Sequence, residues 1–147
     1  MTDRLSLFQE LASAEHGLCV VSMTRADGSI AAAVVNAGVM SHPLSAAEVV
    51  AFVARGRHKL EHLRANPRVT VVARAGWRWA AVEGSVDVIG PDDTRPEVDA
   101  EALRRLLRDV FVAAGGTHDD WDAYDRTLAE ERSAAVLVNP ARTYPSG

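Results

Sequence analysis

Three cations gather around a glycine at the expected start of a short helix. Arg55, Arg57 and Lys59 flank Gly56, and the helical segment that follows stops before Pro67. Helix starts usually carry carboxylates, because their first backbone N–H groups are unpaired and the helix dipole is positive there. Unpaired N–H groups beside a guanidinium and an ammonium form a site for a phosphate-like anion. These residues therefore predict an anion site, and a solvated basic helix without a ligand is the alternative.

Other chemical patterns in the sequence point to no catalytic group. His58 and His62 stand four residues apart, but Lys59 occupies the position where the metalloprotease motif needs glutamate, and no clear third ligand follows. The aspartates around Asp120 lack the spacing of a calcium loop and are electrostatically favourable at a helix start. No P-loop, dinucleotide fingerprint, nucleophile elbow or paired-cysteine site occurs. We therefore expect no metal site and assign no catalytic residue.

Composition limits the class of protein. The 147 residues include 48% apolar and 24% charged residues, which is typical of a globular domain, and we expect one domain over residues 1–147. The net charge of −4 argues against binding to nucleic acid or to an anionic membrane. Cys19 is the single cysteine and lies in an apolar run, which favours a buried, inert thiol. The first residues resemble no signal peptide and no apolar run is long enough to span a membrane, so we expect a cytoplasmic protein.

The order of elements predicts a mainly β fold with flanking helices. Alternating or continuous apolar runs predict six or so antiparallel strands, and apolar residues at helical spacing predict four to five helices. The predicted core is about residues 5–139, followed by a tail over 140–147. The expected strands are Leu18–Thr24, Ile30–Asn36, Val49–Ala54, Val69–Ala73, Trp77–Ile89 and Ala134–Val138. The expected helices cover residues 5–14 and 57–66, a segment capped by Asp99, and one that begins near Thr117.

Three features of the predicted strands bear on binding. The pair Asp27-Gly28 predicts a tight hairpin between the first two strands. Three consecutive alanines at 31–33 leave a flat surface that suits a planar ring, or simply a bulky neighbouring element. Trp77 and Trp79 share one face of the longest strand, which predicts either a ligand wall or an interface between subunits. We expect this face to be buried in a homodimer.

The element order and two segments resemble the pyridoxamine 5′-phosphate oxidase-like split β-barrel family. The segments are residues 57–69, with the sequence RHKLEHLRANPRV, and residues 76–79, with the sequence GWRW. They are similar to an actinobacterial branch that uses coenzyme F-420, a deazaflavin, in place of flavin mononucleotide (FMN). The resemblance extends from about Leu5 to Val138 and implies a split barrel that forms a homodimer with two sites between the subunits.

The resemblance also implies roles for particular residues. Those matching Arg55, Arg57 and Lys59 hold the cofactor phosphate, and the strand matching Val34-Val35-Asn36 runs beside the ring system. Those matching Trp77 and Trp79 lie near the cofactor, contributed by either subunit. The implied activity is hydride transfer from the deazaflavin to a small conjugated or unsaturated molecule.

Alternatives remain open within the same fold. FMN would use the same phosphate site, and a flavin- or haem-binding protein without turnover is the other possibility. The C-terminal segment that holds pyridoxal in the vitamin B6 oxidases is missing from the chain end after Asn139, which argues against B6 oxidation. The lack of an obvious acid or base suits a cofactor that carries its own hydride.

Overall fold

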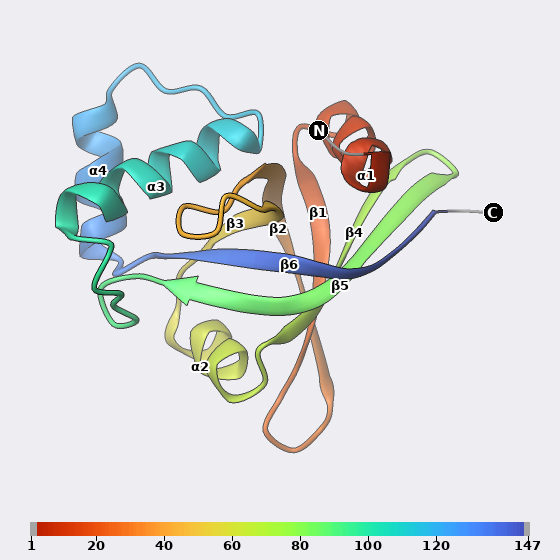
Figure 1. The fold of residues 1–147 in the computed structure, drawn as a ribbon, viewed down its shortest axis with the longest axis horizontal. Helices are drawn as coiled ribbons and strands as arrows, with labels where there is room; N and C mark the ends of the chain where they lie inside the picture. Colours follow the sequence, from red (N-terminus) through yellow and green to blue (C-terminus); the bar gives the residue numbers. More distant parts are fainter. Residues whose placement is uncertain (1–2, 146–147) are drawn as a thin grey trace.

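Six antiparallel strands close into a barrel with four helices outside it, within residues 3–145 that the computed structural model describes (Figure 1). The strand order around the barrel is β1-β2-β3-β6-β5-β4. This confirms the predicted mainly β class with flanking helices, and the architecture is that of a split barrel. The strands are β1 (Leu18–Thr24), β2 (Ile30–Ser41), β3 (Glu48–Ala54), β4 (Arg68–Ala75), β5 (Arg78–Ile89) and β6 (Ala134–Pro145). The helices are α1 (Asp3–Ala14), α2 (Arg57–Ala65), α3 (Ala100–Ala113) and α4 (Trp121–Glu130).

The hairpin predicted at Asp27-Gly28 is confirmed. Gly28 has a φ of 88°, a conformation that is strained for other residues. The Asp27 carboxylate accepts hydrogen bonds from the backbone N–H of Ser29 at 2.9 Å and from its hydroxyl at 2.6 Å. The turn sets the register of the β1–β2 ladder, in which Val20 lies opposite Val34.

Two strands run further than the sequence predicted. The second strand was expected to end at Asn36, yet β2 continues to Ser41 and pairs with β3, with Ser41 opposite Glu48. The last strand was expected to end at Asn139-Pro140, yet β6 continues to Pro145, so most of the predicted tail belongs to the barrel. Residues 1–2 of the N-terminal segment and residues 146–147 of the tail lie outside the described residues.

A bulge allows β6 to pass Pro140. The register shifts between Glu83 and Gly84, so that Glu83 faces Arg142 while Gly84 faces Pro140. A Cβ atom added at Gly84 would lie 1.8 Å from the Asn139 carbonyl oxygen, so the close approach of the two strands requires glycine here.

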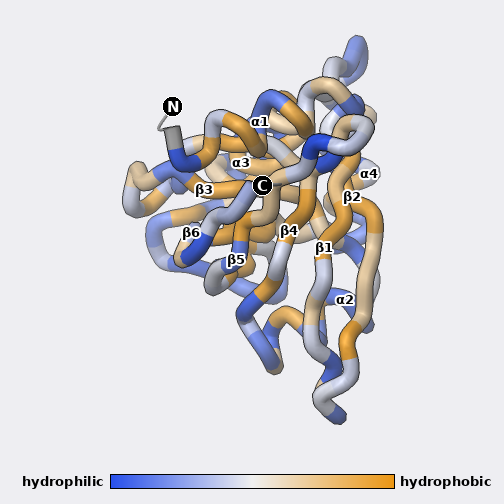
Figure 2. Tube along the Cα trace, turned by 90° about the vertical axis from the view of Figure 1, so that its right-hand side faces the viewer, coloured by the Kyte–Doolittle hydropathy of each residue, from blue (hydrophilic) through white to orange (hydrophobic). Residues whose placement is uncertain are grey.

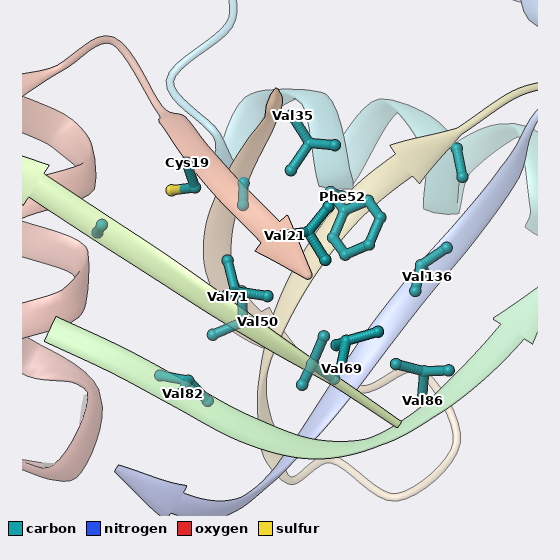
Figure 3. Packing of buried hydrophobic residues seen from close by; sticks show 14 of the residues in the cluster. Cys19, Val21, Val35, Val50, Phe52, Val69, Val71, Val82, Val86 and Val136 are labelled. Carbon is teal, nitrogen blue, oxygen red and sulfur yellow. The ribbon is translucent and has the colours of Figure 1, made fainter. Parts of the chain in front are cut away.

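Two apolar cores lie on opposite faces of the sheet. Alternate residues such as Val21, Phe52 and Val71 fill the barrel interior (Figure 3). Their neighbours in β3 and β6, such as Ala51 and Leu137, pack outward against α3. Helix α1 lies against β4 and β5 through Leu5, Phe8 and Leu11, as its spacing predicted. No helix among the described residues is long and apolar enough to cross a membrane.

Candidate cofactor site

Helix α2 begins without the usual N-terminal support. Gly56 precedes it with a φ of 93°, no side chain caps its first N–H groups, and its first turn contains no acidic residue. The buried residues Leu60 and Leu63 fix the helix against the barrel. Its first turn is therefore held in place by packing and presents backbone donors together with positive side chains.

The three predicted phosphate ligands have different surroundings. Arg55 is exposed and pairs with Glu131 at 2.9 Å, and Arg57 is exposed and pairs with Glu61 at 2.9 Å. Lys59 is half-buried and makes no ion pair within residues 3–145. Burial, and then the charge of Arg55, lower the pKa of Lys59 below its usual value. Lys59 is thus the cation of the three whose charge is not compensated by a carboxylate.

A cleft with a volume of about 320 Å³ brings five of the predicted site residues together. Val34, Val35 and Asn36 of β2 line it, as do Arg55 and Lys59. Arg57, Trp77 and Trp79 do not line it. The remaining lining residues come from β3, α3 and α4: Val53, Val110, Phe111, Ala114, Tyr124 and Leu128.

The α3–α4 side of the cleft is an aromatic wall. The rings of Phe111 and Tyr124 lie 5.0 Å apart, and Trp121 contacts both edge-on. The Tyr124 hydroxyl donates a hydrogen bond of 3.0 Å to the Leu107 carbonyl, and burial raises the pKa of Tyr124 to about 12. Tyr124 is therefore a fixed, neutral part of the wall.

The wall approaches β2 closely because glycine faces the end of α3. A Cβ atom added at Gly38 would lie 1.9 Å from the Ala113 carbonyl oxygen, and one at Gly17 would lie 2.2 Å from that of Ala114. An Arg108–Asp125 ion pair, at 2.9 Å from Nε to Oδ1, holds α4 to α3. The sequence predicted both helices but assigned neither of them to the cofactor site. The signal available in the sequence is the aromatic group Phe111, Trp121 and Tyr124, which two successive helices carry.

The two tryptophans expected near the cofactor lie at the β4–β5 turn. Trp77 is 98% exposed between the two strands, and Trp79 packs edge-on against Tyr144 with a centroid distance of 6.1 Å. Within one chain, the structure does not bring them into the cleft. Their predicted place between subunits stays a prediction.

A second cavity adjoins the cleft on the outer face of β1, β2 and β4. Val34 lines both, and the second cavity measures about 470 Å³ and includes Leu18, Val20 and Val72. This face is apolar and open, with Val34 64% exposed; Figure 2 turns its three strands toward the viewer. Cys19 lines the same cavity, and burial raises the pKa of its thiol to about 12, as expected for an inert cysteine.

The sequence did not reveal a buried polar group outside the cleft. His42 in the β2–β3 loop is 5% exposed, and its Nε2 lies 2.8 Å from the Asp87 carboxylate. The Leu44 N–H donates to His42 Nδ1 at 3.1 Å, so Nε2 carries the proton and donates it to Asp87. The group fixes the loop to β5. His58, by contrast, is exposed, and no group of three or more potential metal ligands occurs among the described residues.

Comparisons with known proteins agree with this architecture. No family model matches the sequence. Among solved structures, the chain is similar to an F-420 reductase at 16% identity, with a TM-score of 0.64 and coverage of 98% of each chain. It is also similar to a pyridoxamine 5′-phosphate oxidase-related, FMN-binding protein from Nostoc punctiforme, at 10% identity and a TM-score of 0.66, over 95% of this chain and 78% of the other.

A third similar structure is a heme-binding protein from Mycobacterium smegmatis. The identity is 13% and the TM-score 0.61, over 99% of this chain and 56% of the other. At such low identities the likeness establishes the fold. The chain therefore has the split-barrel fold of pyridoxamine 5′-phosphate oxidase-like, FMN-binding proteins, a fold that an F-420 reductase also has.

Proposed function

We propose that this protein is an oxidoreductase that uses coenzyme F-420, a deazaflavin, to reduce a small conjugated or unsaturated molecule. The observation that carries the proposal is the composition of the cleft, which has two neighbouring cations, Arg55 and Lys59, and a lining that is otherwise aliphatic or aromatic apart from Asn36. A ring system linked to a phosphate has the same division of polarity. FMN shares that division and is the alternative cofactor.

The basic end of the cleft fits a phosphate. The Lys59 ammonium is uncompensated and half-buried, which strengthens its attraction for an anion. Arg55 is paired with Glu131 on the exposed rim, so a phosphate can contact Arg55 only in competition with this carboxylate; such exposed pairs contribute about 0–1 kcal/mol. The resemblance alone assigns Arg57 to the phosphate, since its side chain pairs with Glu61 outside the cleft.

The remaining walls fit a planar ring. Val34 supplies an aliphatic contact on one side, and Phe111 and Tyr124 supply aromatic contacts on the other. The Val35 side chain points to the opposite face of β2 and is buried in the barrel interior. The Asn36 amide donates to the His16 carbonyl at 3.0 Å, and its oxygen can accept a hydrogen bond from a ring N–H. The cleft volume of about 320 Å³ lies at the lower end for ligand sites, so we expect part of the cofactor to extend over the adjoining cavity.

The proposed chemistry needs little from the protein beyond binding and orientation. Tyr124, Arg55 and Lys59 are the titratable residues that line the cleft among residues 3–145, and Tyr124 already donates its proton to a carbonyl. When bound, the reduced deazaflavin supplies the hydride itself. The chain holds the phosphate, orients the ring and keeps water from one face. Cofactor binding without turnover is the rival function.

We further propose that the protein is a homodimer with its two cleft sites at the subunit interface. The open apolar face formed by Leu18, Val20, Val34 and Val72 is the surface that a second copy would cover. Because Val34 belongs to both this face and the cleft, the second copy would also close the cleft. Val20→Glu should therefore yield monomers in light scattering and weaken cofactor binding. A wild-type monomer at micromolar concentration contradicts the proposal.

Two measurements test the function. The purified protein is titrated with F-420 and with FMN, and binding is followed by the change in cofactor fluorescence. Reduced F-420 is then mixed with the protein and a panel of conjugated acceptors, and its oxidation is followed by absorbance. The proposal predicts binding and faster oxidation with at least one acceptor. Binding without acceleration would favour the rival function, and no binding of either cofactor would refute both.

A further inference from the structure

Two cations line the cleft among the described residues, and a carboxylate compensates one of them. Arg55 and Lys59 are the charged residues that line the cleft within residues 3–145. Glu131 lies 2.9 Å from the Arg55 guanidinium and compensates it, although 76 residues separate the two in sequence. Outside the cleft, Arg57 and Glu61 form a second compensated pair. One positive charge, that of Lys59, remains for an anionic ligand.

The ends of the neighbouring helices do not change this balance. Lys59 lies in the first turn of α2, where the helix dipole places partial positive charge. Glu131 is the C-cap residue of α4, where the dipole places partial negative charge. The two contributions oppose each other, and Glu131 adds a full negative charge at the same end of α4.

Phosphate esters differ in the number of charges that such a site must balance. A phosphomonoester carries about −1.5 to −2 at neutral pH, because its second pKa is about 6. A phosphodiester has no second ionisable oxygen and carries a single negative charge. FMN ends in a monoester, whereas F-420 carries its phosphate as a diester.

We infer that Glu131 is a specificity-determining residue that makes the cleft prefer a phosphodiester over a phosphomonoester. Lys59 balances the single charge of a diester. The second charge of a monoester would have to compete with Glu131 for Arg55, and would meet the Glu131 carboxylate as a like charge. The inference rests on the proposed function, and within it favours the deazaflavin over FMN.

The test uses ligands that differ only at the phosphate. FMN is compared with its phosphate methyl ester, which has the same ring and sugar chain but is a diester, and with riboflavin, which has no phosphate. Affinities are measured by fluorescence titration at pH 7.5 and low salt, because exposed charges are screened at high salt. From the size of partly exposed ion-pair interactions, we expect the wild type to bind the methyl ester about two- to fivefold more tightly than FMN.

Two variants assign the preference to Glu131. Glu131→Gln removes the carboxylate from Arg55, and should increase the affinity for FMN about two- to fivefold and for the methyl ester less, so that the preference disappears. Glu130→Gln is the matched control, because it removes one negative charge from the exposed neighbouring position on α4 and leaves the Arg55 pair intact. This control should keep the wild-type preference.

The outcomes separate the inference from the function on which it rests. Equal or tighter binding of FMN by the wild type, or an unchanged preference in Glu131→Gln, overturns the inference and leaves a flavin-type site in place. Failure of all three flavins and of F-420 to bind overturns both. Loss of the preference in Glu130→Gln as well would show an effect of overall charge, and would also overturn the role of Glu131.

Discussion

Replacing Lys59 by methionine removes the one uncompensated charge of the cleft and keeps the apolar stem of the side chain. A hydrogen bond to a charged group contributes about 1.5–3 kcal/mol, and about 1.4 kcal/mol corresponds to a tenfold change in affinity. Since Lys59 is half-buried and has no carboxylate partner within residues 3–145, the full effect should appear in cofactor binding. We expect Lys59→Met to bind F-420 about ten- to a hundredfold more weakly.

The same substitution should not lower the stability of the cofactor-free protein. Burial and the neighbouring Arg55 already disfavour the charged form of Lys59, and a cation at a helix start is unfavourable. Urea unfolding should therefore give an equal or slightly higher free energy of unfolding for Lys59→Met. Arg57→Met is the control, because it removes a charge from the same helical turn outside the cleft, and should weaken binding less. Unchanged affinity of Lys59→Met for both F-420 and FMN would refute the site assignment.

Four further predictions address the walls and supports of the cleft. Phe111 lines the part of the cleft that we assign to the cofactor ring. Phe111→Ala should therefore weaken the binding of F-420 and of riboflavin by similar factors in fluorescence titrations, and a loss confined to phosphorylated ligands would contradict this. Gly38→Ala should destabilise the fold by about 1–3 kcal/mol in urea unfolding, because the added Cβ would lie 1.9 Å from the Ala113 carbonyl oxygen, and a neutral result would show that α3 moves freely. Partial burial acts to raise the pKa of Asp87, but hydrogen bonds from Asn139 and His42 outweigh it and lower the pKa. The carboxylate therefore stabilises the fold above the unfolded pKa of about 3.9, and this stabilisation is lost as pH falls through the folded pKa. The difference in free energy of unfolding between wild type and Asp87→Asn should shrink below about pH 4, and a constant difference would contradict the assignment. Chelator should leave the melting temperature unchanged in both the wild type and the His58→Gln/His62→Gln double variant, whereas stoichiometric zinc in the purified protein would overturn the assignment of no metal site.

Local signals in the sequence were sufficient for most of the fold. The Asp27-Gly28 turn and the Asp99 cap, whose carboxylate accepts from the Ala102 N–H at 2.8 Å, act over a few residues and are read directly from residue types. The ends of β2 and β6 were predicted too early, because they depend on pairing with strands far away in sequence. Pro140 looks like a strand end until the bulge opposite Gly84 is known.

The candidate site was likewise predicted only in part. The β2 residues Val34–Asn36 and the basic turn at Arg55–Lys59 were named from the sequence and its resemblance to a family, and the structure brings them to one cleft, apart from Arg57. The aromatic wall was not predicted, because Phe111 and Tyr124 fit an ordinary amphipathic stripe. The pairing of Arg55 with Glu131 was not predicted either, because 76 residues separate the two in sequence.

The most direct test of the central claim is a crystal structure of the protein with F-420. We expect the cofactor phosphate within about 3 Å of the Lys59 Nζ atom, a hydrogen-bond distance, and the ring between Val34 and the Phe111–Tyr124 wall. A cofactor bound elsewhere would contradict it, for example in the cavity of about 360 Å³ that includes Leu103, Leu107 and Ser133 and shares Leu128 with the cleft. A phosphate bound at the cleft with Lys59 turned away would contradict it equally.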